Sequence, residues 1–277
     1  MRLGVVIADT YPDKRIARFA AERTLREFPA DECLLLSDSC FVRGARHVYI
    51  PPLSSISEYN ELILDRLHEW ADSNFYLLIQ WDGFVLDGQR WRSEFLRFDY
   101  IGAPWPHLGS AVGAGGFSLR SQNLIQAIHR LRQQEMSSDI LTAEDVQICF
   151  KYRAALREAG IRIARTKTAY AFAFERLLSD TMPFTIPASF GFHGVFNFPL
   201  VLTENEILLL FDSMLPRMGS SIAIWYLFLL HAWQRGYQDL GIKAMTALGE
   251  RSTQLCARVM QICLKQGMDP NWLRSSF

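Results

Sequence analysis

The arrangement of apolar and polar residues changes twice along the chain. In the first part, short continuous apolar runs alternate with segments whose apolar residues recur every three or four positions, which predicts strands that alternate with helices. The predicted strands span residues 3–9, 32–38, 47–52 and 75–83, and the predicted helices span residues 14–28 and 56–72. This alternation is typical of an α/β domain with a largely parallel sheet.

Aspartates follow the predicted strands at three places. Asp9, Asp38 and Asp82 each come at the end of an apolar run. Ligands of such domains bind at the carboxyl ends of the strands, so we expect a site at this edge of the sheet.

Between residues 90 and 198 the pattern becomes irregular, and loops are expected to carry much of the chemistry. The stretch VGAGGFSLR, residues 112–120, places three glycines within a predicted buried strand. Glycine weakens a strand and marks a bulge or the close approach of a ligand or another backbone. Helices are expected over about residues 121–134 and from residue 142 onward, with a short strand at residues 161–165.

After Pro199 the pattern is helical, without strand signals. Apolar residues recur at helical spacing over residues 203–215, 220–234, 239–249 and 252–266. We therefore predict an α/β domain over residues 1–200 and a small all-helical module over residues 201–277. The longest apolar run, residues 222–233, is shorter than the roughly 20 residues that span a bilayer, so it predicts a buried helix and no transmembrane segment.

The composition excludes several classes of protein. Apolar residues make up 49% of the chain, and 29 basic residues balance 29 acidic ones. This balance excludes the global positive field of a nonspecific nucleic-acid binder. The five cysteines are scattered without a C-x-x-C pair, and the first residues lead into a strand pattern rather than a secretory signal. A reduced, cytoplasmic protein is expected.

Three acidic residues are candidates for chemistry when each is taken alone. Asp82 precedes a glycine at the end of a buried strand, where a carboxylate binds a divalent cation or caps a turn. Glu144 and Asp145 open a predicted helix, where acids favour the helix dipole. A carboxylate that points away from solvent there would instead accept a proton from a hydroxyl. The residues alone leave these alternatives open.

Other side chains leave similar alternatives. His193 is bracketed by glycines and aromatic residues, which suits a core histidine or a metal ligand. Arg120 follows the glycine-rich stretch, where it would pair with a phosphate or lie in solvent on the next helix. Several aromatic residues are expected in the core rather than in a sugar-stacking surface: Trp81, Trp91, Trp105 and Phe117.

The order of these motifs resembles that of a known family. The stretches QWDGFVLD, FDYIGAPW, VGAGGFSLR, AEDVQIC and FGFHG follow one another between residues 80 and 194. They resemble a family of bacterial and fungal glycosyltransferase-like proteins catalogued as a domain of unknown function, and more broadly the glycosyltransferases of the GT-A type. The resemblance covers about residues 3–198 and implies a GT-A-like, Rossmann-like domain with a mostly parallel sheet that binds a nucleotide sugar.

The resemblance also implies a metal site for Mn²⁺ or Mg²⁺. Asp82 matches the metal-binding acid of the family's D-x-D signature, and Gln80 stands where the first acid would be. His193 matches a late histidine that completes the metal site. The metal would neutralise the charge that develops on the departing diphosphate.

Roles for the glycine stretch and the acidic pair follow in the same way. Gly115 and Gly116 match a glycine pair that lets sugars lie against the backbone, and Ala114 replaces an asparagine of the family pattern. Asp145 matches the catalytic base of inverting relatives, and Glu144 beside it would contact substrate. The implied reaction is a single displacement at the anomeric carbon with inversion.

The resemblance further implies the substrates. The donor is a nucleotide-diphosphate sugar, with a UDP-sugar expected, and Asp9, Tyr11 and Arg120 are assigned to its binding. The acceptor is a saccharide or glycolipid in polysaccharide biosynthesis, which leaves peripheral contact with the cytoplasmic face of a membrane open.

Two further interpretations remain at this stage. A nucleotide-sugar-binding or scaffold protein with weakened catalysis is favoured by Gln80 and Ala114, and it would act on a protein partner through residues 201–277. A metal-dependent hydrolase that uses the same acids would release free sugar.

Overall fold

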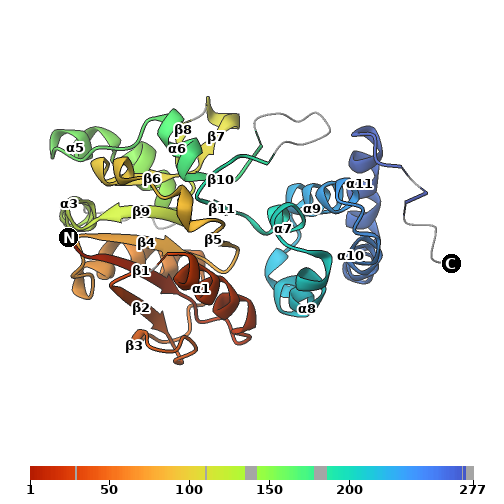
Figure 1. The fold of residues 1–277 in the computed structure, drawn as a ribbon, viewed down its shortest axis with the longest axis horizontal. Helices are drawn as coiled ribbons and strands as arrows, with labels where there is room; N and C mark the ends of the chain where they lie inside the picture. The colour runs from red at the N-terminus through yellow and green to blue at the C-terminus, as the bar shows by residue number, and fades with distance from the viewer. Residues whose placement is uncertain (29, 110, 135–141, 178–185, 270, 273–277) are drawn as a thin grey trace. The chain divides into compact units, whose positions relative to one another are not determined.

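The computed structural model describes residues 1–28, 30–109, 111–134, 142–177, 186–269 and 271–272. The chain divides into two compact units (Figure 1). The first comprises Met1–Arg176 with Pro187–His193, and the second comprises Leu177–Ile186 with Gly194–Phe277. The first unit is mixed α/β and the second is helical.

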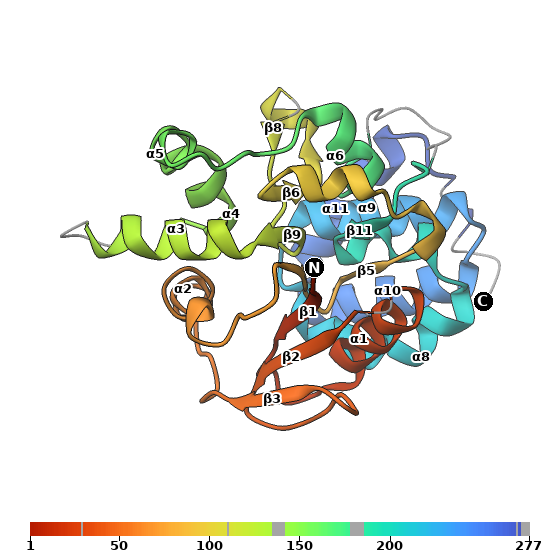
Figure 2. The same ribbon diagram turned by 60° about the vertical axis from the view of Figure 1, so that its left-hand side comes forward.

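The first unit contains a central sheet with the strand order β3-β2-β1-β4-β9-β6 (Figure 1; Figure 2 shows the same sheet after a turn of 60°). Strands β3, β2, β1 and β4 are mutually parallel, whereas β9 runs antiparallel to both β4 and β6. The predicted α/β class with a mainly parallel sheet is therefore confirmed. The strand bounds are β1 Leu3–Ala8, β2 Glu32–Ser37, β3 Arg46–Tyr49, β4 Phe75–Ile79, β6 Tyr100–Gly102 and β9 Phe117–Ser121.

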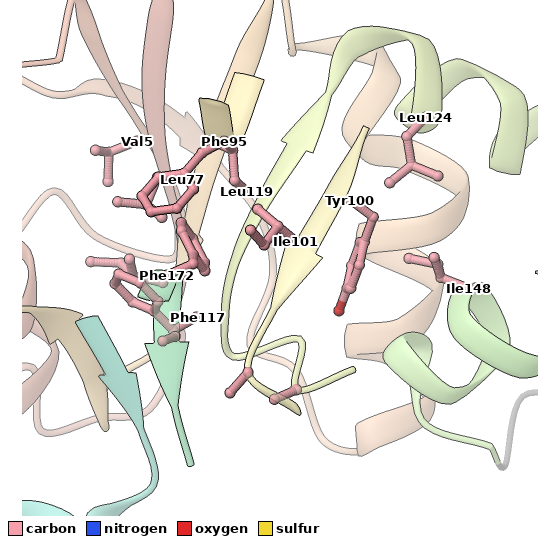
Figure 3. Close-up of a cluster of buried hydrophobic side chains, with 14 of the residues drawn as sticks. Val5, Leu77, Phe95, Tyr100, Ile101, Phe117, Leu119, Leu124, Ile148 and Phe172 are labelled. Carbon is pink, nitrogen blue, oxygen red and sulfur yellow. The ribbon is translucent and has the colours of Figure 1, made fainter. Parts of the chain in front are cut away.

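Continuous apolar runs form these strands because both faces of the sheet are covered. Along β1 the side chains alternate, so that Val5 and Ile7 join one buried cluster and Val6 joins another. Helix α1 (Arg15–Glu27) packs on the first cluster, and α2 (Ile56–Glu61) leads into a π-helical turn that packs on the second. Figure 3 shows side chains of the first cluster, among them Val5, Leu77 and Leu119.

A smaller sheet has the order β10-β11-β5, with β10 Ala173–Phe174, β11 Gly191–His193 and β5 Gly83–Val85. Strands β5 and β11 are antiparallel, and His193 is the register partner of Gly83. Because Asp82 precedes Gly83, this register brings Asp82 beside His193.

The glycine-rich stretch is not a continuous strand, which corrects the prediction for residues 112–120. Strand β8 (Ala111–Val112) pairs with β7 (Pro104–Trp105), β9 begins only at Phe117, and residues 113–116 connect them. Ala114 in this connection has a positive φ of 49°. This left-handed backbone conformation occurs more readily in a glycine-rich loop than in a regular β-strand.

The rest of the first unit consists mainly of short elements. Helix α3 spans Gln122–Gln133, close to the prediction, and Ser121 caps it. After α4 (Glu144–Val146) the backbone forms a π-helical turn over Gln147–Lys151, and the helices α5 and α6 follow at Arg153–Glu158 and Thr166–Phe172. The predicted strand at residues 161–165 is wrong, since an isolated bridge joins Ile163 to Tyr100 there.

The second unit is built from helices, as predicted. They are α7 Phe198–Val201, α8 Glu204–Met214, α9 Ile222–Gln234, α10 Gln238–Arg251 and α11 Thr253–Lys265. Helix α8 starts with a capping box between Thr203 and Glu206. Helix α9 buries Trp225 and Phe228 in the core of the unit. No helix within the described residues has the length and apolar character needed to cross a membrane.

Candidate active site

Asp82 and His193 meet at the paired strands β5 and β11. His193 Nε2 lies 3.4 Å from Asp82 Oδ1, and both side chains are largely buried. The contact follows from the antiparallel register, because His193 faces Gly83, the residue after Asp82. The two residues that the resemblance assigns to a metal are thus adjacent in space.

Glu175 holds the other side of the His193 ring. Its Oε1 lies 2.9 Å from His193 Nδ1, and its Oε2 accepts a 2.9 Å hydrogen bond from Trp105 Nε1. Glu175 directly follows β10, which runs parallel to β11, so the strand register places it next to His193. Glu175 was not among the predicted site residues, because its role depends on the pairing of β10 with β11, and strands of two and three residues give no periodicity in the sequence.

The two carboxylates determine the charge of this histidine. Burial alone would lower the pKa of His193, but Asp82 and Glu175 raise that pKa well above its usual value. Burial likewise opposes ionisation of Glu175, yet its bonds to His193 hold the pKa of this carboxyl below its usual value. Without a metal, the two carboxylates therefore favour the protonated form of His193.

The glycine loop packs directly on these groups. A Cβ atom on Gly116 would collide with Nε2 of His193 and would lie 2.6 Å from Oε1 of Gln80. A Cβ atom on Gly115 would collide with the carboxylate of Glu144 and would lie 3.0 Å from Cβ of Asp145. Glycine is required at both positions because these side chains occupy the space.

Asp145 is tied to the same loop. Its Oδ2 accepts a 2.8 Å hydrogen bond from the backbone N–H of Gly115, and its Oδ1 accepts one of 2.8 Å from Val146 N–H. The side chain is only half-buried. A carboxylate in this position is held in one orientation while remaining accessible to a ligand.

Glu144 is buried and paired with Arg120. Arg120 Nη2 lies 2.8 Å from Glu144 Oε1, and the guanidinium lies over the Tyr100 ring at 5.5 Å from its centroid. Burial and Asp145 raise the pKa of Glu144 although Arg120 opposes this change. Arg120 belongs to β9 and is 2% exposed, so its interpretation as a solvated side chain on the next helix is wrong. Its contact with a phosphate stays a prediction.

Asp9, Tyr11 and Asp38 lie at the ends of β1 and β2. Lys14 Nζ lies 2.6 Å from Asp38 Oδ1 and donates a 3.1 Å hydrogen bond to the carbonyl of Asp9. Slight burial alone would raise the pKa of Asp38, but the hydrogen bond and the charge of Lys14 lower that pKa. The Tyr11 N–H donates to Asp9 Oδ1 at 3.0 Å. A nucleoside contact of Asp9 and Tyr11 stays a prediction.

The aromatic residues divide between the core and the edge of the site. Phe117 is fully buried, and Trp91 packs on Phe28 and Phe190. Trp105 is also buried, but it reaches the site through its bond to Glu175 and stacks on Phe150 with 6.0 Å between the ring centroids.

Fold and site together define an α/β protein with an acid–histidine pair beside a glycine loop. The family model described as "Protein of unknown function (DUF5672)" matches residues 45–193, more than half of the chain. The chain therefore belongs to this family, which confirms the resemblance at the level of a family of unknown function. No curated protein has a significant sequence match to this chain.

Several solved structures match this chain with low sequence identity and low TM-scores. The galactosyltransferase LgtC, in complex with donor and acceptor sugar analogs, is 14% identical with a TM-score of 0.39, covering 69% of this chain and 86% of its own. S. aureus TarS 1-349 is 9% identical with a TM-score of 0.38, covering 99% of this chain and 91% of its own. A197 from STIV is 14% identical with a TM-score of 0.33, covering 59% and 80% respectively. At these TM-scores the likeness carries no functional argument.

Proposed function

We propose that this protein is a metal-dependent glycosyltransferase that moves a sugar from a nucleotide-diphosphate sugar to an acceptor hydroxyl with inversion. The observation that carries the proposal is the glycine loop with its neighbours: Gly116 packs on His193, which contacts Asp82, while the N–H of Gly115 holds Asp145. The proposed cation site and the candidate base thus both contact one loop, and a displacement at a single carbon requires such proximity.

The donor atoms of Asp82 and His193 fit Mn²⁺ or Mg²⁺. An octahedral ion about 2.1 Å from two adjacent ligands holds them about 3 Å apart, close to the 3.4 Å between Oδ1 and Nε2. A bond from Nδ1–H to Glu175 leaves the lone pair of Nε2 for a metal. When bound, the ion supplies charge to stabilise the departing diphosphate.

Asp145 is the proposed base in this reaction. It accepts the proton of the acceptor hydroxyl as that oxygen attacks the anomeric carbon from the face opposite the diphosphate. The buried ion pair of Glu144 and Arg120 packs against the glycine loop and stabilises it. Asp9 and Tyr11 are proposed to contact the nucleoside of the donor, for which a UDP-sugar is our first candidate.

A second candidate is a nucleotide-sugar-binding or scaffold protein with weakened catalysis. Gln80 stands where an acid is expected, and its Nε2 donates a hydrogen bond to the Tyr59 hydroxyl at 2.9 Å. In the part of the chain that the structure describes, no group of three or more histidine, cysteine, aspartate or glutamate side chains is arranged to hold a metal. Under this candidate, residues 201–277 would bind a protein partner.

Release of nucleoside diphosphate tests the two candidates. Purified protein with Mn²⁺ is incubated with a panel of nucleotide sugars. A transferase is expected to release the nucleoside diphosphate from one of them. Asp145→Asn should abolish release and leave donor binding intact, because the amide cannot accept the proton. Asp212→Asn, an exposed acid in the helical unit, is the control. Normal turnover by Asp145→Asn contradicts the assignment of the base, and binding without release by the native protein favours the second candidate.

A further inference from the structure

Phe150 is exposed in the helical segment that follows the candidate base Asp145. It is 44% exposed and is the exposed phenylalanine among the described residues, whereas phenylalanines of the core such as Phe117 and Phe172 are fully buried. Leaving an apolar ring in water forgoes the free energy of its burial. A ligand that covers this ring would recover part of that free energy.

The ring has a rigid support. Phe150 stacks on Trp105 with an angle of 10° between the ring planes, and the Trp105 indole donates its N–H to Glu175. The same indole packs on Gly113, where a Cβ atom would collide with it. Fixed on two sides, Trp105 holds Phe150 with little conformational freedom to lose on binding.

Two observations connect this stacked pair with Asp145. Trp105 and Asp145 pack on glycines two positions apart in one loop, Gly113 and Gly115. Phe150 and Asp145 also belong to one helical segment, where the π-helical turn Gln147–Lys151 has i→i+5 hydrogen bonds such as Tyr152 N–H to Gln147 O. Residues five positions apart lie closer to one face there than in an α-helix, and such turns are frequent at functional sites.

We propose that Phe150, supported by Trp105, is the stacking surface for the sugar ring of the acceptor, a saccharide whose hydroxyl is directed to Asp145. This inference rests on the proposed function and names the acceptor class of that site. A pyranose presents apolar C–H groups on one face and hydroxyls at its edge. An aromatic face together with the half-buried carboxylate of Asp145 matches both features.

Saturation-transfer NMR with a panel of methyl glycosides tests the proposal on the full chain. The C–H protons of at least one glycoside should receive saturation from the native protein. Phe150→Ala should weaken this binding about tenfold, whereas Phe150→Tyr and Phe150→Trp should retain it. Leu209→Ala, which removes an exposed apolar side chain of the helical unit, should have no effect.

The outcomes separate this inference from the transferase proposal. If no donor releases its nucleoside diphosphate but glycoside binding depends on Phe150, the stacking surface is supported and the transferase proposal is wrong. If a donor turns over, the KM for the acceptor should rise about tenfold in Phe150→Ala, whereas Leu209→Ala should leave this KM unchanged. Glycoside binding that is absent, or equal in Phe150→Ala and native protein, overturns the stacking surface.

Discussion

Nε2 of His193 lies 3.4 Å from Oδ1 of Asp82, although the two residues are far apart in the sequence. The antiparallel register of β5 and β11 creates the contact, and the absence of a side chain on Gly116 leaves room for the imidazole. In the metal-free protein Asp82 and Glu175 favour the protonated form of His193, because they raise its pKa. A metal would therefore compete with a proton for Nε2 of His193.

Loss of either donor should weaken metal binding. Asp82→Asn and His193→Gln each remove a ligand, so we expect Mn²⁺ affinity to fall tenfold or more, since even the loss of a partner outside the metal's ligands costs about 10–100-fold. Titration with Mn²⁺ followed by electron paramagnetic resonance measures this affinity without any substrate. Asp212→Asn should bind Mn²⁺ like the native protein. Equal affinity in all three variants would contradict the metal site.

Glu175 should act as a positioning residue for His193. Glu175→Ala removes the acceptors of both Nδ1–H and the Trp105 indole N–H, so Mn²⁺ affinity should fall about 10–100-fold. Glu175→Gln keeps one carbonyl acceptor and should lie between the alanine variant and the native protein. The ¹⁵N shifts of the His193 ring provide a second readout, because Glu175 raises the pKa of His193 and the protonated fraction of the ring should fall from the native protein through Glu175→Gln to Glu175→Ala. An unchanged ring spectrum in Glu175→Ala would contradict this role of Glu175.

The sequence predicted the elements that have long apolar patterns. The runs that became β1, β2 and β4 are continuous because the sheet is covered on both faces, and α1 and α3 have a clear helical period. The same rules also indicated the edge at which Asp9 and Asp38 lie. Local apolar patterns are enough to predict these elements, and the rule that ligands bind at the carboxyl ends of parallel strands is enough to predict the edge.

Features that depend on distant pairing were not predictable from the residues alone. Glu175 acquires its role only because β10 pairs with β11, and both strands have too few residues for a pattern. Arg120 was expected at a phosphate or in solvent, since no local signal reveals the buried carboxylate of Glu144 that faces it. The loop over residues 113–116 was mistaken for a strand because apolar residues flank its glycines.

The buried ion pair of Arg120 and Glu144 should be important for stability. Glu144→Gln leaves the guanidinium buried without a carboxylate, which should lower the free energy of unfolding by about 3–5 kcal/mol. Removing the exposed pair of Lys243 and Asp212 by Asp212→Ala should cost less than about 1 kcal/mol. Urea denaturation of both variants measures the difference. A loss in Glu144→Gln no larger than in Asp212→Ala would refute this ranking.

Ala114 should carry backbone strain. Its φ of 49° lies in the left-handed region, which costs an alanine about 1–2 kcal/mol, whereas glycine adopts it freely. Ala114→Gly relieves this strain but loses a buried methyl group and adds entropy to the unfolded chain, so the free energy of unfolding should change by less than about 1 kcal/mol. The matched variant is Ala127→Gly, at a buried position of the regular helix α3, which should lower it by about 2 kcal/mol. Both values come from urea denaturation, and an equal loss of stability in the two variants would argue against strain at Ala114.

His231 should make the protein less stable in mild acid. The side chain is buried in α9 and its Nδ1–H donates a 2.7 Å hydrogen bond to the carbonyl of Phe196, and burial lowers the pKa of His231 to about 4. The ordinary pKa of histidine is about 6.5, so the unfolded chain binds a proton that the folded protein excludes. This contribution is complete above pH 6.5 and is lost progressively as the pH falls toward 4, by up to about 3 kcal/mol.

Thermal unfolding between pH 7 and about pH 4.5 checks this contribution. In His231→Gln the melting temperature should fall less steeply with acid, because glutamine does not titrate, although the variant starts from a lower value since its packing is altered. His107→Gln, at an exposed histidine, should keep the native dependence on pH. If His231→Gln and the native protein lose stability in parallel, the acid sensitivity has another origin than the exclusion of a proton from this buried ring.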